Sequence, residues 1–93
     1  MRGSINFYVG EIKKVSAQVR ARNPNEVVVI TKAKYSLKNI ASGETVEDGN
    51  LEIDGDTVST ILGIDEAGTF ELKITVKVGA ETFIEKATVQ TAG

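Results

Sequence analysis

The chain contains no cysteine, no histidine and no tryptophan, and it has a single proline among its 93 residues. Without cysteine it has no disulfide and no thiolate metal ligand. Without histidine it also lacks the commonest general base and the usual imidazole ligand. Only carboxylate, lysine, hydroxyl and tyrosine chemistry is left. We therefore predict that the protein is not an enzyme, that it has no catalytic, cofactor-binding or metal-binding residues, and that it needs no cofactor.

Long apolar stretches are absent as well. The longest uninterrupted run is Val27 to Ile30, far short of the roughly 20 residues of a membrane-spanning helix, so no membrane partner is expected. No secretory signal opens the chain, and Met1-Arg2-Gly3-Ser4 resembles an expression-vector leader. We therefore expect residues 1–4 to be a leader and residues 5–93 to form a single domain. The composition, 41% hydrophobic and 26% charged, is that of a folded globular protein.

Alternation of apolar and polar residues runs through almost the whole chain, and it is cleanest from Phe70 to Val78. This period of two is typical of half-buried strands, and no helix longer than a turn is predicted. Short strands separated by turn residues are typical of a sandwich or barrel. We predict an all-β, immunoglobulin-like β-sandwich of about seven to eight antiparallel strands, over residues 5–9, 14–21, 27–38, 44–47, 51–53, 57–62, 70–78 and 81–90.

Glycine-containing turns divide these strands. Asp48-Gly49-Asn50 and Asp54-Gly55-Asp56 each predict a turn, the first of them joining residues 44–47 and 51–53 as a hairpin. Gly79-Ala80 predicts a two-residue turn before the last strand. In that strand the neighbours Phe83 and Ile84 are both apolar, which interrupts the alternation and predicts a bulge. Residues 27–30 also depart from the alternation, because they are apolar on both faces.

A corner at residues 66–72 carries a first resemblance. Its sequence, Glu-Ala-Gly-Thr-Phe-Glu-Leu, matches the acid-x-Gly-x-aromatic-x-core spacing with which immunoglobulin domains enter their sixth strand. Phe70 stands where antibody domains have tyrosine, and Leu72 stands where they have cysteine. The resemblance therefore implies an immunoglobulin-like topology without the disulfide or the tyrosine-corner hydrogen bond.

Residues 30–90 carry a second resemblance, through an Ala-Lys-Tyr-Ser-Leu strand, a Leu-Glu-Ile-Asp-Gly segment, the corner, and a final Val-Gly-Ala-Glu-Thr-Phe-Ile hairpin. This pattern is similar to that of immunoglobulin-like modules in structural proteins of tailed bacteriophages and of prophages of Gram-positive hosts. The resemblance implies a non-catalytic accessory module of a tail, baseplate or capsid protein, located in the virion, with other virion subunits, a host surface or a second copy as partner. Surface modules of bacterial adhesins share the pattern. A binding or spacer module of an extracellular or cell-surface protein is therefore the alternative.

Two acidic features are candidates for sites. The stretch Asp48–Asp56 offers oxygen atoms to calcium, but an EF-hand loop beginning at Asp48 would have Ile53 and Ser59 where glycine and glutamate are needed, so turn formation is favoured. Asp65 and Glu66 are the candidates for a catalytic carboxylate pair. Adjacent acids at an exposed corner are more often solvated turn residues, and no metal or catalytic site is predicted.

Charge is distributed unevenly along the chain. Residues 1–38 carry a net charge of +6 and residues 39–93 one of −8, for a total of −2. Seven basic residues lie on the outward phases of the second and third predicted strands: Lys13, Lys14, Arg20, Arg22, Lys32, Lys34 and Lys38. The negative total and the lack of interleaved aromatic residues favour a solvated outer face over a nucleic-acid site. Tyr8 is the one aromatic residue expected to point outward.

Overall fold

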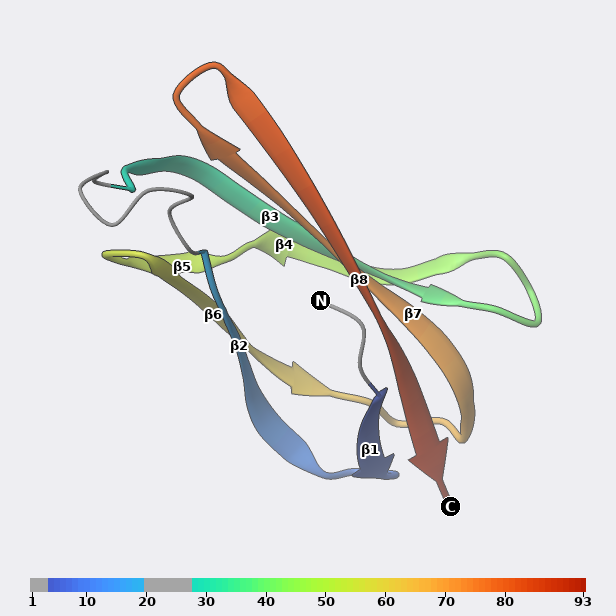
Figure 1. Cartoon of the computed structure of the whole chain (residues 1–93). Coiled ribbons are helices and arrows are strands. Elements are labelled where there is room, and N and C mark those ends of the chain that lie inside the picture. Colours follow the sequence, from blue (N-terminus) through green and yellow to red (C-terminus); the bar gives the residue numbers. More distant parts are fainter. Residues whose placement is uncertain (1–3, 20–27) are drawn as a thin grey trace.

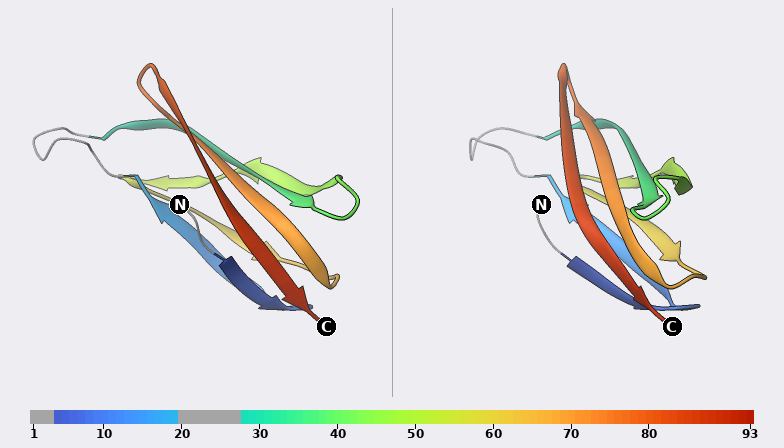
Figure 2. Two further views of the ribbon diagram at one scale, coloured as in Figure 1. Left: turned by 45° about the vertical axis from the view of Figure 1, so that its right-hand side comes forward. Right: turned by 90° about the vertical axis from the view of Figure 1, so that its right-hand side faces the viewer.

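Eight strands form two sheets that pack face to face in the computed structural model, which describes residues 4–19 and 28–93 (Figure 1). The strands are β1 (Ser4–Tyr8), β2 (Ile12–Gln18), β3 (Ile30–Asn39), β4 (Thr45–Asn50), β5 (Glu52–Asp54), β6 (Thr57–Gly63), β7 (Gly68–Val78) and β8 (Glu81–Ala92). The larger sheet has the order β1-β8-β7-β3-β4 and the smaller one the order β2-β6-β5. Figure 2 shows the two layers from two further directions. The described residues contain no helix, as predicted.

The core lies between the two sheets and is built by the predicted alternation. In β7 every second residue from Phe70 to Val76 is buried, and the residues between them face outward. The smaller sheet contributes Val58 and Leu62 from β6 to the same hydrophobic cluster. Six side chains are almost completely buried: Phe70, Leu37, Leu62, Leu72, Val58 and Val89. The corner residues Phe70 and Leu72 are therefore core residues, as the sequence pattern predicts.

The glycine turns predicted at Gly55 and Gly79 are confirmed. Asp54-Gly55-Asp56 joins β5 and β6, with Gly55 at a φ of +62°, and Gly79-Ala80 joins β7 and β8, with Gly79 at a φ of +60°. Both φ values fall in the left-handed region, which glycine enters without the steric cost that a Cβ atom brings.

The prediction of a turn at Asp48-Gly49-Asn50 is wrong. These residues end β4, which pairs with β3, so that Gly49 lies opposite Tyr35. A Cβ atom at Gly49 would lie only 3.3 Å from Cε1 of Tyr35. The close approach of the Tyr35 ring therefore explains why a glycine stands at this position in a strand. β4 and β5 form no hairpin, because the chain changes sheets at Leu51. That residue is buried, and its N–H donates to the carbonyl oxygen of Ala33 at 2.9 Å.

The first strand corrects one further prediction. β1 runs parallel to β8, from the pair Ser4 and Thr88 to the pair Tyr8 and Ala92, so the strands are not all antiparallel. Ser4 is the first residue of β1. Met1 to Gly3 lie outside the described residues.

The last strand contains no bulge. Its register with β7 is continuous from Thr91 to Glu81, which places Phe83 on the inner face and leaves Ile84 57% exposed on the outer one. The irregularity lies in β3, where the register shifts between Ile30 and Lys32. Residues 28 and 29 precede β3, and residue 27 is outside the described part of the chain.

Candidate interaction surface

The outer face of the larger sheet is rich in lysine. The strand registers place outward the residues of β3, β4, β7 and β8 that alternate with those facing the smaller sheet. Six of these outward residues are lysines: Lys32, Lys34, Lys38, Lys73, Lys77 and Lys86. Among the described residues, only Asp48 and Glu71 bring negative charge to these positions. We call this surface the basic face.

The lysines of the basic face lie directly beside one another in two places. Lys73 of β7 is paired with Lys86 of β8, and Lys77 of β7 is paired with Lys32 of β3. Directly opposed residues of antiparallel strands have Cβ atoms about 4.5–5.5 Å apart, and like charges at such positions destabilise a sheet. Both pairs therefore work against folding stability.

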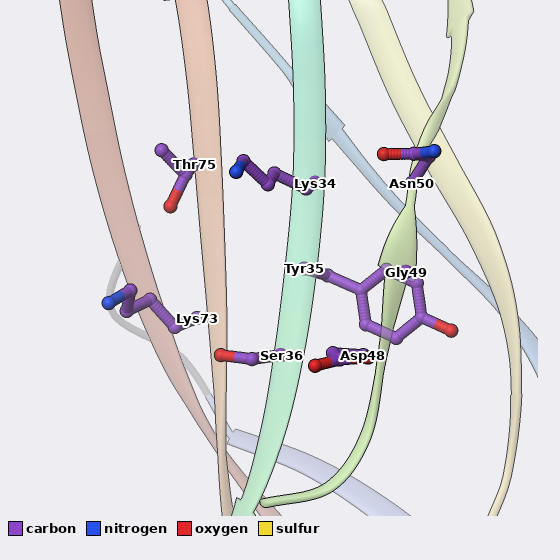
Figure 3. Close-up of a pocket in the computed structure, with 8 residues that line it drawn as sticks. All are labelled: Lys34, Tyr35, Ser36, Asp48, Gly49, Asn50, Lys73 and Thr75. Carbon is purple, nitrogen blue, oxygen red and sulfur yellow. The ribbon is translucent and has the colours of Figure 1, made fainter.

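A hollow of about 440 Å³ lies at the centre of the basic face (Figure 3). Lys34 and Lys73 border it on opposite strands. Lys34 of β3 is paired with Thr75 of β7, and Lys73 of β7 is paired with Ser36 of β3, so a short side chain lies beside each lysine. Figure 3 shows Lys34 extending towards Thr75, while Asp48 lies on the β4 side. Ammonium and hydroxyl groups are suited to binding carboxylate oxygens. The hollow is open to solvent, so it fits the surface of a macromolecule better than an enclosed small ligand.

Tyr35 anchors β4 beneath this hollow. Its side chain belongs to the inner face, where it is 9% exposed, and its hydroxyl group donates a hydrogen bond of 3.1 Å to Oε1 of Glu47. Burial raises the pKa of the Tyr35 phenol above its ordinary value, and the neighbouring carboxylate of Glu47 raises it further, while a hydrogen bond with Thr60 acts in the opposite direction.

The titration of Tyr35 gives a first prediction. In a Tyr8→Phe variant, Tyr35 is the single tyrosine, and its absorbance at 295 nm should titrate at higher pH in the folded protein than in concentrated urea. Because the folded pKa is the higher one, this contribution to stability should be fully present below the unfolded pKa of about 10 and should be lost as pH rises from there through the folded pKa. Replacing Tyr35 with phenylalanine should remove this part of the pH dependence. Equal midpoints in the folded and unfolded states would contradict the prediction.

The basic set predicted from the sequence does not gather on one face. β2 and β3 belong to different sheets, so Lys13 and Lys14 are separated from Lys32, Lys34 and Lys38. Lys13 donates to the carbonyl oxygen of Asn6 at 2.9 Å and lies 5.3 Å from the centre of the Phe7 ring. Arg20 and Arg22 lie outside the described residues.

Lys73, Lys77 and Lys86 belong to the basic face, but the sequence does not predict that they lie beside Lys32, Lys34 and Lys38. The alternation in β7 already indicated that Lys73 and Lys77 face outward, but nothing in the sequence paired β7 with β3. The sequence does not show which way Lys86 points, because apolar residues occur on both faces of β8.

The acidic stretch Asp48–Asp56 is divided between the two sheets. Asp48 lies on the basic face, while Glu52 and Asp54 belong to β5 of the smaller sheet. Asp56 accepts a hydrogen bond of 2.9 Å from Nε2 of Gln18, which together with Thr57 holds the pKa of the Asp56 carboxyl below its usual value. Within residues 4–19 and 28–93, no three acidic groups lie close enough together to hold a metal ion.

Asp65 and Glu66 lie at the corner between β6 and β7, beside a hollow of about 360 Å³ that Glu47 also lines. Glu66 accepts a hydrogen bond of 3.2 Å from Nδ2 of Asn39. Both acidic residues of the corner are exposed. Glu47, Asp65 and Glu66 thus bring three carboxylates to one hollow, and exposed acids at such a corner form solvated turns more often than catalytic sites.

Comparison with known proteins bears on the fold. No protein-family model matches the sequence, and no curated protein matches it. A crystal structure of CopC from Methylosinus trichosporium OB3b is similar to this chain with a TM-score of 0.68 at 11% identity, over 96% of this chain and 83% of that one. A structure of the titin M10–obscurin-like 1 immunoglobulin complex is similar with a TM-score of 0.50 at 14% identity, over 97% of this chain and 85% of that one. The chain is an immunoglobulin-like β-sandwich.

At sequence identities of 11% and 14%, these two structures show that the fold is shared, and they carry no information about function. Among the residues that the structure describes, there is no helix that could cross a membrane.

Proposed function

We propose that this domain is a non-catalytic interaction module that binds an acidic protein surface through its basic face, and that it is an accessory domain of a bacteriophage or prophage virion protein. The observation that carries the first part is the pairing of Lys73 with Lys86 and of Lys32 with Lys77. Each pair costs folding stability, and neither contributes to the core. A function in binding explains why the sheet carries them.

The physical argument concerns relief of repulsion. Like charges directly opposite each other on a sheet repel, and the repulsion grows where solvent is partly displaced. A carboxylate placed between two such lysines replaces repulsion with attraction. The gain is greatest at the centre of the face, where Lys34 and Lys73 border the hollow. Charge complementarity of this kind raises association rates and selects against wrong partners.

The virion assignment is supported by the resemblance of residues 30–90 to phage and prophage modules, and the lack of histidine and cysteine supports a module without catalysis. Other virion subunits are the partners that this proposal names. A second copy is another, because Asp65 and Glu66 offer an acidic corner on the same chain. Sedimentation velocity at low and high salt measures self-association directly, since contacts between exposed charges weaken as the salt concentration rises.

The binding proposal is tested by reversing one charge in the basic face. We expect Lys73→Glu to weaken binding of poly-L-glutamate roughly threefold to tenfold, as measured by NMR titration at low salt. Chemical-shift changes in the native protein should concentrate on β3, β7 and β8. The matched control is Lys14→Glu, which changes the net charge equally but lies on the smaller sheet. Equal weakening by both variants would show a nonspecific effect of net charge and would reject the basic face as the site.

The virion proposal needs a separate experiment. Antibodies raised against the domain should label the tail, baseplate or capsid of particles released after prophage induction, as seen by immunogold electron microscopy. Labelling of the bacterial surface without labelling of particles would reject the virion assignment in favour of a cell-surface spacer or binding module.

A further inference from the structure

A hollow of about 690 Å³ lies on the larger sheet, at the end where β1 and β8 finish and β7 begins. Figure 2 shows the ends of β1 and β8 side by side in both views. The hollow reaches Tyr8, which lies four residues beyond Ser4, about 13 Å along the extended strand. It is therefore remote from the first described residue of the chain. We call it the polar hollow.

Three polar side chains form one row across the strands of this hollow. Asn6 of β1 is paired with Gln90 of β8, and Gln90 is paired with Thr69 of β7. All three are exposed and alternate with buried residues of their strands, so they face outward. Because neighbouring strands lie about 4.8 Å apart, two amide groups and a hydroxyl group follow one another at that spacing. None of the hydrogen bonds between described residues uses these three side chains. We call them the polar row.

Tyr8 adds an exposed aromatic ring beside the polar row. It follows Asn6 by two residues in β1 and therefore lies on the same face of the sheet. Its partner in β8 is Ala92, which has only a methyl group as side chain. Tyr8 is 71% exposed and lines the polar hollow. The site thus combines an apolar ring face with neighbouring groups that donate and accept hydrogen bonds.

Lys13 is the one charged residue among the described residues that line the polar hollow, and its ammonium group is already engaged. Its Nζ donates a hydrogen bond of 2.9 Å to the carbonyl oxygen of Asn6 and lies 3.2 Å from Oε1 of Glu11. It also lies 5.3 Å from the centre of the Phe7 ring. The polar hollow therefore offers neutral hydrogen-bonding groups, whereas the basic face offers positive charge.

We propose that the polar hollow binds a neutral glycan, with one sugar ring packed on Tyr8 and its hydroxyl groups bonded to the polar row. A sugar ring has an apolar C–H face, which fits an aromatic ring, and hydroxyl groups that both donate and accept hydrogen bonds, as the polar row does. An anionic ligand is disfavoured because Glu11 already pairs with Lys13. The hollow is open, which suits a short stretch of a glycan chain bound along the surface. The inference goes beyond the proposed function and adds a ligand site to the module.

NMR titration of the native domain tests the proposal with a fixed set of neutral probes. These are the methyl glycosides of glucose, galactose, mannose and N-acetylglucosamine, together with maltotetraose and tetra-N-acetylchitotetraose. At least one of them should shift the signals of the polar row and of the Tyr8 ring, and the shifts should saturate at millimolar sugar. Signals of the basic face should stay in place, whereas poly-L-glutamate should shift those and leave the polar row unchanged.

Two substitutions with matched controls separate the ring from the amide. Tyr8→Ala should weaken binding of the sugar at least tenfold, while Tyr8→Phe keeps the ring and should retain most of the affinity. Gln90→Ala should weaken binding at least threefold. Its control is Thr88→Ala, which trims an exposed side chain two residues earlier in β8, outside the described lining of the polar hollow. Thermal melts verify that the variants fold, and the titration of the native protein decides the question for any that does not.

Three results would overturn the inference: no saturable shift with any of the six probes, shifts that are centred away from the polar row, or affinities that Tyr8→Ala and Gln90→Ala leave unchanged. Binding of poly-L-glutamate involves Lys73 on the basic face, and Tyr8→Ala should not alter it. The glycan site can therefore fail while the basic face stands, and the reverse also holds.

Discussion

Replacing Phe70 with alanine is expected to lower the free energy of unfolding by about 3–5 kcal/mol. The Phe70 side chain is completely buried, at 0% exposure, and it belongs to the hydrophobic cluster that joins the two sheets. Truncation removes apolar contacts on both sides and leaves a cavity that a close-packed core refills only in part. Because a domain of this size is stable by about 5–15 kcal/mol, the loss is a large fraction of the total.

Urea unfolding monitored by circular dichroism measures this effect. The midpoint should fall with little change in slope, and the melting temperature should drop by more than about 10 °C. Ile40→Ala serves as the control, because it removes an exposed aliphatic side chain and should change stability by no more than about 0.5 kcal/mol. A similar small effect for Phe70→Ala would show that the corner does not hold the core together.

The successes of the sequence analysis come from local chemistry. Alternation from Phe70 to Val78 identified the inward residues, because a strand places successive side chains on opposite faces. Gly55 and Gly79 marked true turns, because each adopts a positive φ that other residues rarely enter. The prediction that Tyr8 points outward is also confirmed, at 71% exposure.

The failures involve contacts between distant residues. The Asp and Asn neighbours of Gly49 predict a turn, but Gly49 lies in β4, beside the ring of Tyr35 from another strand. The neighbouring residues in the sequence do not distinguish a glycine in a turn from a glycine that packs beside an aromatic ring. The parallel pairing of β1 with β8 joins the two ends of the chain, and no local pattern encodes it.

The candidate surface was predictable only in part. Outward positions in β3 and β7 follow from alternation: Lys34 is predicted to face outward, and the alternation from Phe70 to Val78 places Lys73 outward as well. That they border one hollow depends on the β3–β7 register. The polar row depends on the pairing of β8 with β1 and with β7, which no single strand reveals.

The second large effect is expected for Leu62→Ala, at about 2–5 kcal/mol of lost stability. Leu62 is 0% exposed in β6, the central strand of the smaller sheet, and lies in the same hydrophobic cluster as Phe70. Neither sheet can bury its inner face without the other, since two layers share one core. The loss should therefore destabilise the larger sheet as much as the smaller one.

Two signals recorded in one titration separate this cooperative result from its alternative. In a Tyr8→Phe background, the fluorescence of Tyr35 reports on the larger sheet, while circular dichroism reports on both sheets. With Leu62→Ala, the two unfolding curves should coincide and move together to lower urea. Ile61→Ala provides a matched control one position along β6, because Ile61 is 65% exposed on the outer face and its loss should leave both curves almost unchanged.

A Tyr35 curve that stays in place while the dichroism curve moves would mean that the larger sheet is stable alone. The domain would then unfold in two steps, and the core that joins Leu62 to Phe70 would not act as one unit.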